Sequence, residues 1–340
     1  MAGAPSDPGR APVAFGRWAV PQLFGQLGPD SDSRLPALAS LCDLIRDPEQ
    51  LYRTVHGGFL ECLKVLLEDE DPSIRAKSCE LLHLLMGHDI GRQALLSSSL
   101  LPPLSQLLDD SSPSCRTNVH RVLNRLVLLP AGAAALLTLV PKLMLRLRDE
   151  EEEEVQVLLL STISCCSRLD ALPALASDGV SQFGRKLTHR NPNIRREAAA
   201  AMMALSVSKE GKRQVCKEAV LPVLVGLLQD EDVEVQTNAA GVVMYTVVLT
   251  PGKQQCLELD AVPVLLDLVK AEGEEEEDVA RKRKALLLYS LRALTALAEA
   301  SDGRRLLLER LPLLVRRTED EDEDIRRAAQ TAVRVVTWTP

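Results

Sequence analysis

The stretch that decides the fold is SKEGKRQVCKEAVLPVLVGLLQDEDVEVQTNAA, residues 208–240. It contains a glycine followed by a cation, Gly211-Lys212, which could end a phosphate-binding loop or could be a structural joint. A similar phrase, TPGKQQCLELDAVPVLLDLV, places its Gly-Lys pair 41 residues later, and Gly-Arg pairs occur at Gly91 and Gly303. A nucleotide site would occur once, and the Ser or Thr that a phosphate loop needs after the lysine is missing. The recurrence therefore favours a joint between repeats.

The same period marks the start of the last helix expected in each unit. An apolar residue or Cys followed by Arg or Gln recurs there at intervals of 41, 40, 39 and 41 residues, and then after 90 residues, which is two units plus an insertion. A period near 40 is typical of armadillo and HEAT helical repeats. The second members of these pairs, which we call the anchor residues, are Arg75, Arg116, Gln156, Arg195, Gln236 and Arg326.

Apolar residues within a unit follow the helical period. Leu221, Leu224, Leu227 and Leu228 share one side of a predicted helix, and Pro222 stands near its start, where a missing N–H costs nothing. A second apolar stripe follows the Asp-rich turn. Glycine suits the end of that second helix because it accepts a positive φ without a Cβ penalty. We therefore expect the recurring glycines to lie in turns between units: Gly91, Gly132, Gly211, Gly252 and Gly303.

The composition agrees with an all-α fold, since Leu and Ala dominate and aromatic residues make up 3%. We predict an armadillo/HEAT-type right-handed superhelical solenoid of about eight repeats, forming one array over residues 17–340. Residues 1–16 are rich in Pro, Gly and Ala and are predicted to be disordered. Acidic loop insertions are expected near 149–154, 271–278 and 319–324.

Metal, cofactor and catalytic chemistry find no support in the sequence. Cys216 and Cys256 are 40 residues apart at the same place in successive units, so we predict buried, unreactive packing residues. Cys-x-x-Cys pairs are absent, and His83 and His88 have the wrong spacing for a helical metal pair. We expect no catalytic residue, no metal, no cofactor and no enzyme activity. The uncharged stretch Leu126–Pro141 is too short to span a membrane, so no membrane partner is expected.

The three acidic runs all fall in the turn before a unit's last helix, and therefore on one edge of the predicted solenoid. Two interpretations stay open. The runs are solvated loops that place negative charge at helix N-termini, or they form a docking edge for a basic partner. A net charge of −8 argues against nucleic acid as a ligand, and the same argument disfavours direct contact between this edge and the acidic microtubule lattice.

Several segments resemble the radial spoke head 14 homologue family. They are LCDLIRDPEQLYRTVHGGFLECLKVLLEDEDPSIRAKSCELLH at 41–83, SPSCRTNV at 112–119, VSKEGKRQVC at 207–216 and VEVQTNAAGVVM at 233–244. The similarity is collinear over about residues 36–270 and resumes from Ala293, whereas the acidic insertion and both chain ends depart from it. The resemblance implies a non-enzymatic component of axonemal radial spokes in motile cilia and flagella, located in the cytoplasm and cytoskeleton, whose partners are other radial spoke proteins.

The last helix of each armadillo unit lines the concave surface, which predicts where a partner binds. In RTNVHRVLNRL the side opposite the core presents Asn118, Arg121 and Arg125. Asn238 and Tyr245 hold two equivalent positions further along the chain. We predict that these five residues form a partner-binding groove, with simple solvation as the alternative.

A second function class is an armadillo-repeat adaptor for signalling or nuclear transport. Importin-α-like receptors present Trp-x-x-x-Asn on successive last helices to grip a basic peptide. The aligned positions here hold Gly241 and Tyr245, Ala200 and Ala204, and Arg121 and Arg125. The missing ladder argues against cargo import, and a signalling adaptor stays open.

Overall fold

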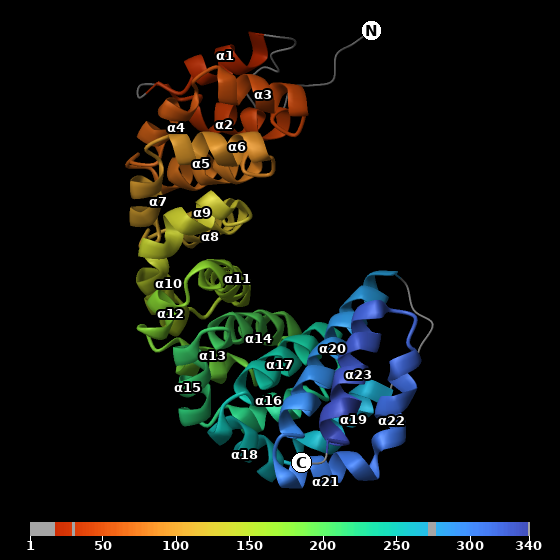
Figure 1. Cartoon of the computed structure of the whole chain (residues 1–340). Coiled ribbons are helices and arrows are strands. Elements are labelled where there is room, and N and C mark those ends of the chain that lie inside the picture. The colour runs from red at the N-terminus through yellow and green to blue at the C-terminus, as the bar shows by residue number, and fades with distance from the viewer. Residues whose placement is uncertain (1–17, 29–30, 271–276, 339–340) are drawn as a thin grey trace. The chain divides into compact units, whose positions relative to one another are not determined.

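The computed structural model describes residues 18–28, 31–270 and 277–338. These residues form helices and contain no strand, which confirms the predicted fold class (Figure 1). The chain divides into two compact units, Met1–Leu139 and Val140–Pro340, which are described separately. The predicted disordered segment 1–16 and most of the acidic insertion, residues 271–276, lie outside the described residues.

The first unit is a stack of repeats in which short helices lead to a longer one (Figure 1). The long helices are α2 (Arg34–Leu44), α5 (Pro72–Leu85) and α8 (Pro113–Leu126), and α5 contacts both of the others. The short helices are α1 (Ala19–Gly25), α3 (Pro48–His56), α4 (Leu60–Leu66), α6 (Asp89–Ser97), α7 (Leu101–Leu107) and α9 (Pro130–Leu136), followed by the 3₁₀ turn η2 (Leu137–Leu139).

The second unit continues the same order with five long helices, each in contact with the next. With three in the first unit, the described residues hold eight, in agreement with about eight predicted repeats. The long helices are α11 (Glu153–Leu169), α14 (Pro192–Ser206), α17 (Val233–Thr246), α20 (Glu277–Leu297) and α23 (Glu323–Val336). The short elements are α10 (Val140–Asp149), α12 (Leu172–Leu175), α13 (Gly179–Lys186), α15 (Lys209–Lys217), α16 (Leu221–Leu227), α18 (Thr250–Glu258), α19 (Ala261–Lys270), α21 (Ser301–Glu309), α22 (Leu311–Arg316) and η3 (Arg317–Glu319).

The long helices start where local sequence dictates. The side chains of Asp71, Ser112 and Asn191 each accept a hydrogen bond from a backbone N–H two or three residues ahead. A proline follows each cap and needs no partner for its missing N–H. Asp232 caps α17 in the same way without a proline. Cap and proline together explain why the turns before these helices recur in sequence.

The anchor residues recur because their side chains close the turn behind them. One terminal nitrogen of Arg75 donates to the carbonyls of Asp69 and Glu70 at 2.8 and 3.0 Å. Arg195 does the same with the carbonyls of residues 189 and 190, both at 3.0 Å. These bonds satisfy backbone acceptors that neither neighbouring helix can pair. The other anchors also bond a carbonyl six residues earlier: Arg116, Gln156, Gln236 and Arg326.

Two anchor arginines also join successive repeats. Arg75 makes a two-bond contact of 2.6 and 3.0 Å with Asp110, which lies in the next repeat. Arg195 holds Asp230 in the same way at 2.8 and 3.1 Å. The Asp110 and Asp230 side chains are 3% and 7% exposed, so these are nearly buried charge-assisted pairs that fix the spacing between repeats.

The predicted role of the recurring glycines is wrong. All five lie in the first turn of a short helix, and among the described glycines only Gly58 has a positive φ. A Cβ added to Gly211 would overlap the carbonyl of Leu205. A Cβ added to Gly252 would likewise lie only 2.5 Å from the carbonyl oxygen of Thr246. Each short helix therefore rests directly on the end of the preceding long helix. Glycine is needed for this close approach and not for a turn.

The core follows the predicted stripes, with Leu221, Leu224 and Leu228 fully buried. One helical stretch, Pro130–Asp149, is long and apolar enough to cross a membrane by length and composition. Its buried residues, such as Leu136 and Leu143, recur at helical spacing, as in a helix that packs inside a protein. Such core helices meet the same criterion.

Candidate partner-binding surface

The predicted groove residues of the first unit lie on α8, and one of them is not exposed. Asn118 is 8% exposed, and its side-chain amide donates to the Ala76 carbonyl on α5 at 3.0 Å. The expectation of an exposed Asn118 was therefore wrong, because this amide holds two successive long helices together. Helix spacing places Asn118 on the same side of α8 as Arg121 and Arg125. Spacing alone does not show that α5 covers Asn118.

Arg121 and Arg125 follow on the same side of α8, one turn apart. Arg121 donates to the Asn118 side-chain oxygen at 3.1 Å and is half-buried, whereas Arg125 is exposed. His83 on α5 lies close to both arginines. Burial lowers the pKa of His83, and the nearby positive charges lower it further, so its imidazole is neutral near pH 7. The α5–α8 surface therefore carries two guanidinium groups, of which that of Arg121 is held by Asn118, and guanidinium groups match carboxylate groups of a partner.

Asn238 and Tyr245 lie on α17 in the second unit. Both are half-buried, and the Lys212 ammonium lies 5.7 Å from the centre of the Tyr245 ring. A cation over a tyrosine face stabilises the ring's position. Asn118, Arg121 and Arg125 are brought together within one unit, and Asn238 and Tyr245 within the other. The groove joining all five stays a prediction.

A contact that the sequence did not reveal surrounds Gly241, which holds the tryptophan position of importin-like receptors. A Cβ added to Gly241 would overlap the Met203 sulfur from α14 and would lie 3.5 Å from Tyr289 of α20. Met203 and Tyr289 are half-buried. A methionine of one long helix thus occupies the space above the next, because that helix has no side chain there. In the sequence, this contact is indicated only by the presence of glycine at position 241.

The acidic turns carry structural bonds as well as charge. Glu153 accepts a 2.6 Å bond from the Asn191 side chain in the next repeat, which with the Arg190 side chain lowers the pKa of Glu153 against the opposing effect of desolvation. Lys284 of α20 lies 2.7 and 2.9 Å from Asp322 and Asp324. Part of the acidic edge is therefore paired to neighbouring repeats. Both interpretations of the remaining carboxylates stay open.

The predicted thiols differ from each other. Cys256 is fully buried, and burial raises the pKa of its thiol to about 12. Cys216 is only partly buried, so the prediction that both are buried was wrong for this residue. Cys216 lies five residues after Gly211, whereas Cys256 lies four residues after Gly252, so the helix turns Cys216 away from the buried side on which Val215 lies. Within residues 18–28, 31–270 and 277–338, no group of three His, Cys, Asp or Glu side chains is arranged to hold a metal ion.

Comparison with known proteins agrees with this geometry. The family model of the armadillo/beta-catenin-like repeat matches residues 208–243, which hold α15, α16 and most of α17. Among solved structures, the chain is similar to the crystal structure of an engineered protein from the Northeast Structural Genomics Consortium. The TM-score is 0.78 and the identity 18%, over 95% of this chain and 89% of that chain.

A designed armadillo repeat protein is also similar. Its TM-score is 0.62 and its identity 21%, over 67% of this chain and 99% of that chain. At these identities the likeness defines the fold and leaves the partner open. The helical repeats, the match at residues 208–243 and these similar structures together show that the chain has an armadillo-repeat fold.

Proposed function

We propose that this chain is a non-enzymatic scaffold of axonemal radial spokes in motile cilia and flagella, where it binds other spoke proteins. The four resembling segments, which are collinear over residues 36–270, carry the proposal. A stack of repeats supports such a role because each repeat contacts only its neighbours and leaves a long side free for a partner. No nucleic acid, membrane or cofactor is part of the proposal.

The binding surface that we assign first is the α5–α8 surface with Arg121 and Arg125. Arginine is enriched at the energetic centres of protein interfaces, because its fixed fork of donors matches carboxylates. The Asn118 bond to α5 orders this surface before a partner arrives, which reduces the entropy lost on binding. An acidic segment of another spoke protein fits the two positive charges.

The function is tested by tagging the protein in ciliated cells and extracting their cilia with a non-ionic detergent. The proposal predicts that the protein stays with the axoneme. Release into the soluble fraction, or accumulation at the nucleus, would contradict the spoke assignment and favour the signalling or transport adaptor.

The surface is tested by replacing Arg121 and Arg125 together with alanine while Asn118 is left intact. Arg125 is exposed and Arg121 loses one hydrogen bond to Asn118, so the double variant should lose no more than about 1.5 kcal/mol of stability and stay folded, while axonemal recovery falls. A matched control replaces Arg185 and Arg190, whose side chains are 64% and 90% exposed, and should incorporate normally. Equal incorporation of both variants would exclude the α5–α8 surface as the docking site.

A further inference from the structure

One repeat of the second unit is irregular. Its first helix, α12, has four residues, whereas the first helices of the next two repeats, α15 and α18, have nine each. Counting 16 residues from the anchors Arg195 and Gln236 leads to Gly211 and Gly252 (211 − 195 and 252 − 236). The same count from Gln156 leads to position 172, which is a leucine.

Leu172 accounts for the shortened helix. Any Cβ at the equivalent glycines would overlap a carbonyl at the end of the preceding long helix, so a leucine cannot make that approach. Instead, α11 continues to Leu169 and has 17 residues, against 15 in α14 and 14 in α17. The first helix then begins late and ends after one turn. The sequence change thus removes most of one helix from the stack.

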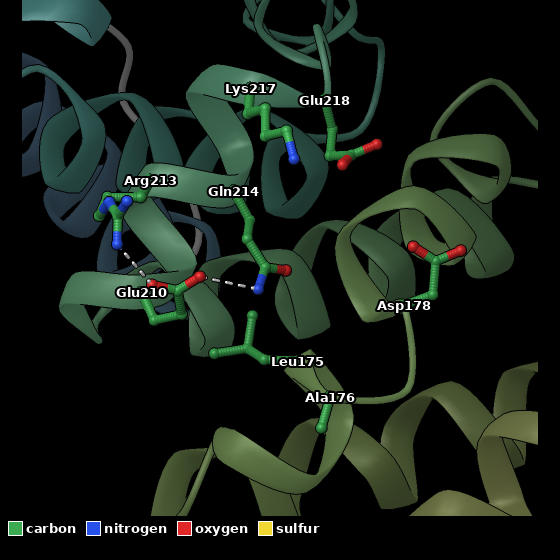
Figure 2. A pocket seen from close by; sticks show the side chains of 8 residues that line it. All are labelled: Leu175, Ala176, Asp178, Glu210, Arg213, Gln214, Lys217 and Glu218. Atoms are coloured by element: carbon green, nitrogen blue, oxygen red, sulfur yellow. Dashed lines mark hydrogen bonds and ion pairs between the residues drawn. The ribbon is translucent and has the colours of Figure 1, made fainter.

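A hollow of about 480 Å³ lies where the shortened helix leaves α15 uncovered (Figure 2). Leu175, Ala176 and Asp178 line one side of it. The other side is a single face of α15 together with the residue that follows it, and the lining residues are spaced at i, i+3, i+4, i+7 and i+8: Glu210, Arg213, Gln214, Lys217 and the C-cap Glu218. The hollow therefore runs along the length of the helix, over about 12 Å for the eight steps of about 1.5 Å between positions 210 and 218.

The hydrogen bond of the Gln214 side chain differs from that of its equivalent in the next repeat. Its equivalent in the next repeat, Gln255, lies 41 residues later and donates to the Cys216 carbonyl at 3.1 Å. That carbonyl is among the last four of α15, which have no partner within the helix. Gln214 instead donates to Glu210 in its own helix at 3.1 Å, as Figure 2 shows. The Gln255 side chain thus joins two successive first helices, whereas the Gln214 side chain bonds to its own helix.

We propose that this hollow binds a short amphipathic helix of a partner protein, which takes the place of the missing first-helix residues. Gln214 then donates to a carbonyl at the C-terminal end of the docked helix, as Gln255 does for α15. Exposed Lys217 lies near that end, where a cation is favoured by the helix dipole. This surface is separate from the α5–α8 surface.

The apolar side of the docked helix faces α12. Leu172 is 61% exposed and lies one turn before Leu175, which lines the hollow. The charged side chains on α15 do not suit an apolar small molecule, whereas a helix with one apolar and one polar side matches both walls.

The probe is a capped, stapled helical peptide that copies residues 88–98 of this chain, which hold α6, another nine-residue first helix. Binding of the fluorescent peptide to the full chain is measured by anisotropy, and the side-chain amide signals of Gln214 and Gln255 are followed by NMR. We expect saturable binding that shifts the Gln214 signal alone. Gln214→Ala should weaken the affinity about three- to tenfold, the effect of one hydrogen bond.

Two controls separate the hollow from other surfaces. Gln255→Ala removes the equivalent amide where the neighbouring helix is already present, and should leave the affinity unchanged. The same peptide with proline in place of its central glutamine (Gln93→Pro) cannot form the helix and should not bind. Absence of binding at millimolar peptide, equal binding of the proline peptide, or an affinity insensitive to Gln214→Ala would each overturn the proposal.

Discussion

The close-packed glycines provide a prediction with an unusual sign. Alanine normally stabilises a helix by about 1 kcal/mol relative to glycine. Gly211 lies inside α15 with no positive φ, so a sequence-based estimate favours Gly211→Ala. The structure predicts the opposite, because the added Cβ would lie 2.6 Å from the Leu205 carbonyl carbon and closer still to its oxygen.

The magnitude follows from the atoms that must move. Cβ contacts below 3.0 Å essentially never occur, and the obstacle at Gly211 is backbone, which cannot rotate away as a side chain can. The helix α15 must therefore shift away from the end of α14 and loosen the fully buried Val215. Overpacking of this kind costs about 3 kcal/mol at the upper end of its range, and helix propensity offsets about 1 kcal/mol. The net destabilisation is about 2 kcal/mol.

The assay is urea unfolding followed by circular dichroism at 222 nm, with Gly226→Ala as the matched control. Gly226 lies within α16, and an added Cβ meets nothing within 4 Å. Gly226→Ala should therefore stabilise the protein by about 0.5–1 kcal/mol, the ordinary helix effect. If Gly211→Ala shifts the midpoint upward together with Gly226→Ala, the close-packing explanation of the repeat glycine is refuted.

Three further predictions concern single side chains. Burial raises the pKa of Asp110, but hydrogen bonds led by that from Arg75 outweigh it, and the net pKa is lowered. Stability from Asp110 is then present above its unfolded pKa near about 4 and lost as pH falls through the folded pKa. Asp110→Asn should therefore reduce the difference between urea midpoints at pH 7 and pH 3, and an unchanged difference would contradict this. Asn118→Ala removes the bond from α8 to the Ala76 carbonyl and the acceptor of Arg121, and should cost about 0.5–1.5 kcal/mol in the same assay, whereas no loss would contradict its structural role. A thiol reagent should modify exposed Cys62 quickly and buried Cys256 only on unfolding, and equal rates would contradict the described burial.

The repeat period and the helix order could be predicted from sequence because both depend on local spacing. Leucines at helical intervals and turn residues before the long helices are visible in the chain itself. The predicted role of Gly211 was wrong because a glycine after a helix commonly marks a turn with positive φ, and only packing distinguishes this from a close approach.

The placement of three candidate residues on one helix was predictable for the same reason, whereas their role in binding stays a prediction. Helix spacing places Asn118, Arg121 and Arg125 on one side of α8, as the structure confirms for their helix. The bond from Asn118 to Ala76 depends on how α5 packs against α8, which spacing cannot specify. The hollow beside α15 results from Leu172 at a glycine position, and its meaning follows only when the glycine's packing role is known.

The central proposal is that the chain is a scaffold component of axonemal radial spokes. Its most direct test is to release radial spokes from detergent-extracted axonemes with high salt and to sediment the extract through a sucrose gradient. The account predicts that the protein co-sediments with the spoke subunits at a constant ratio across the peak, and that it is absent from axonemes that lack spokes. A protein that sediments alone near its monomer mass, or that persists in spokeless axonemes, would contradict the account.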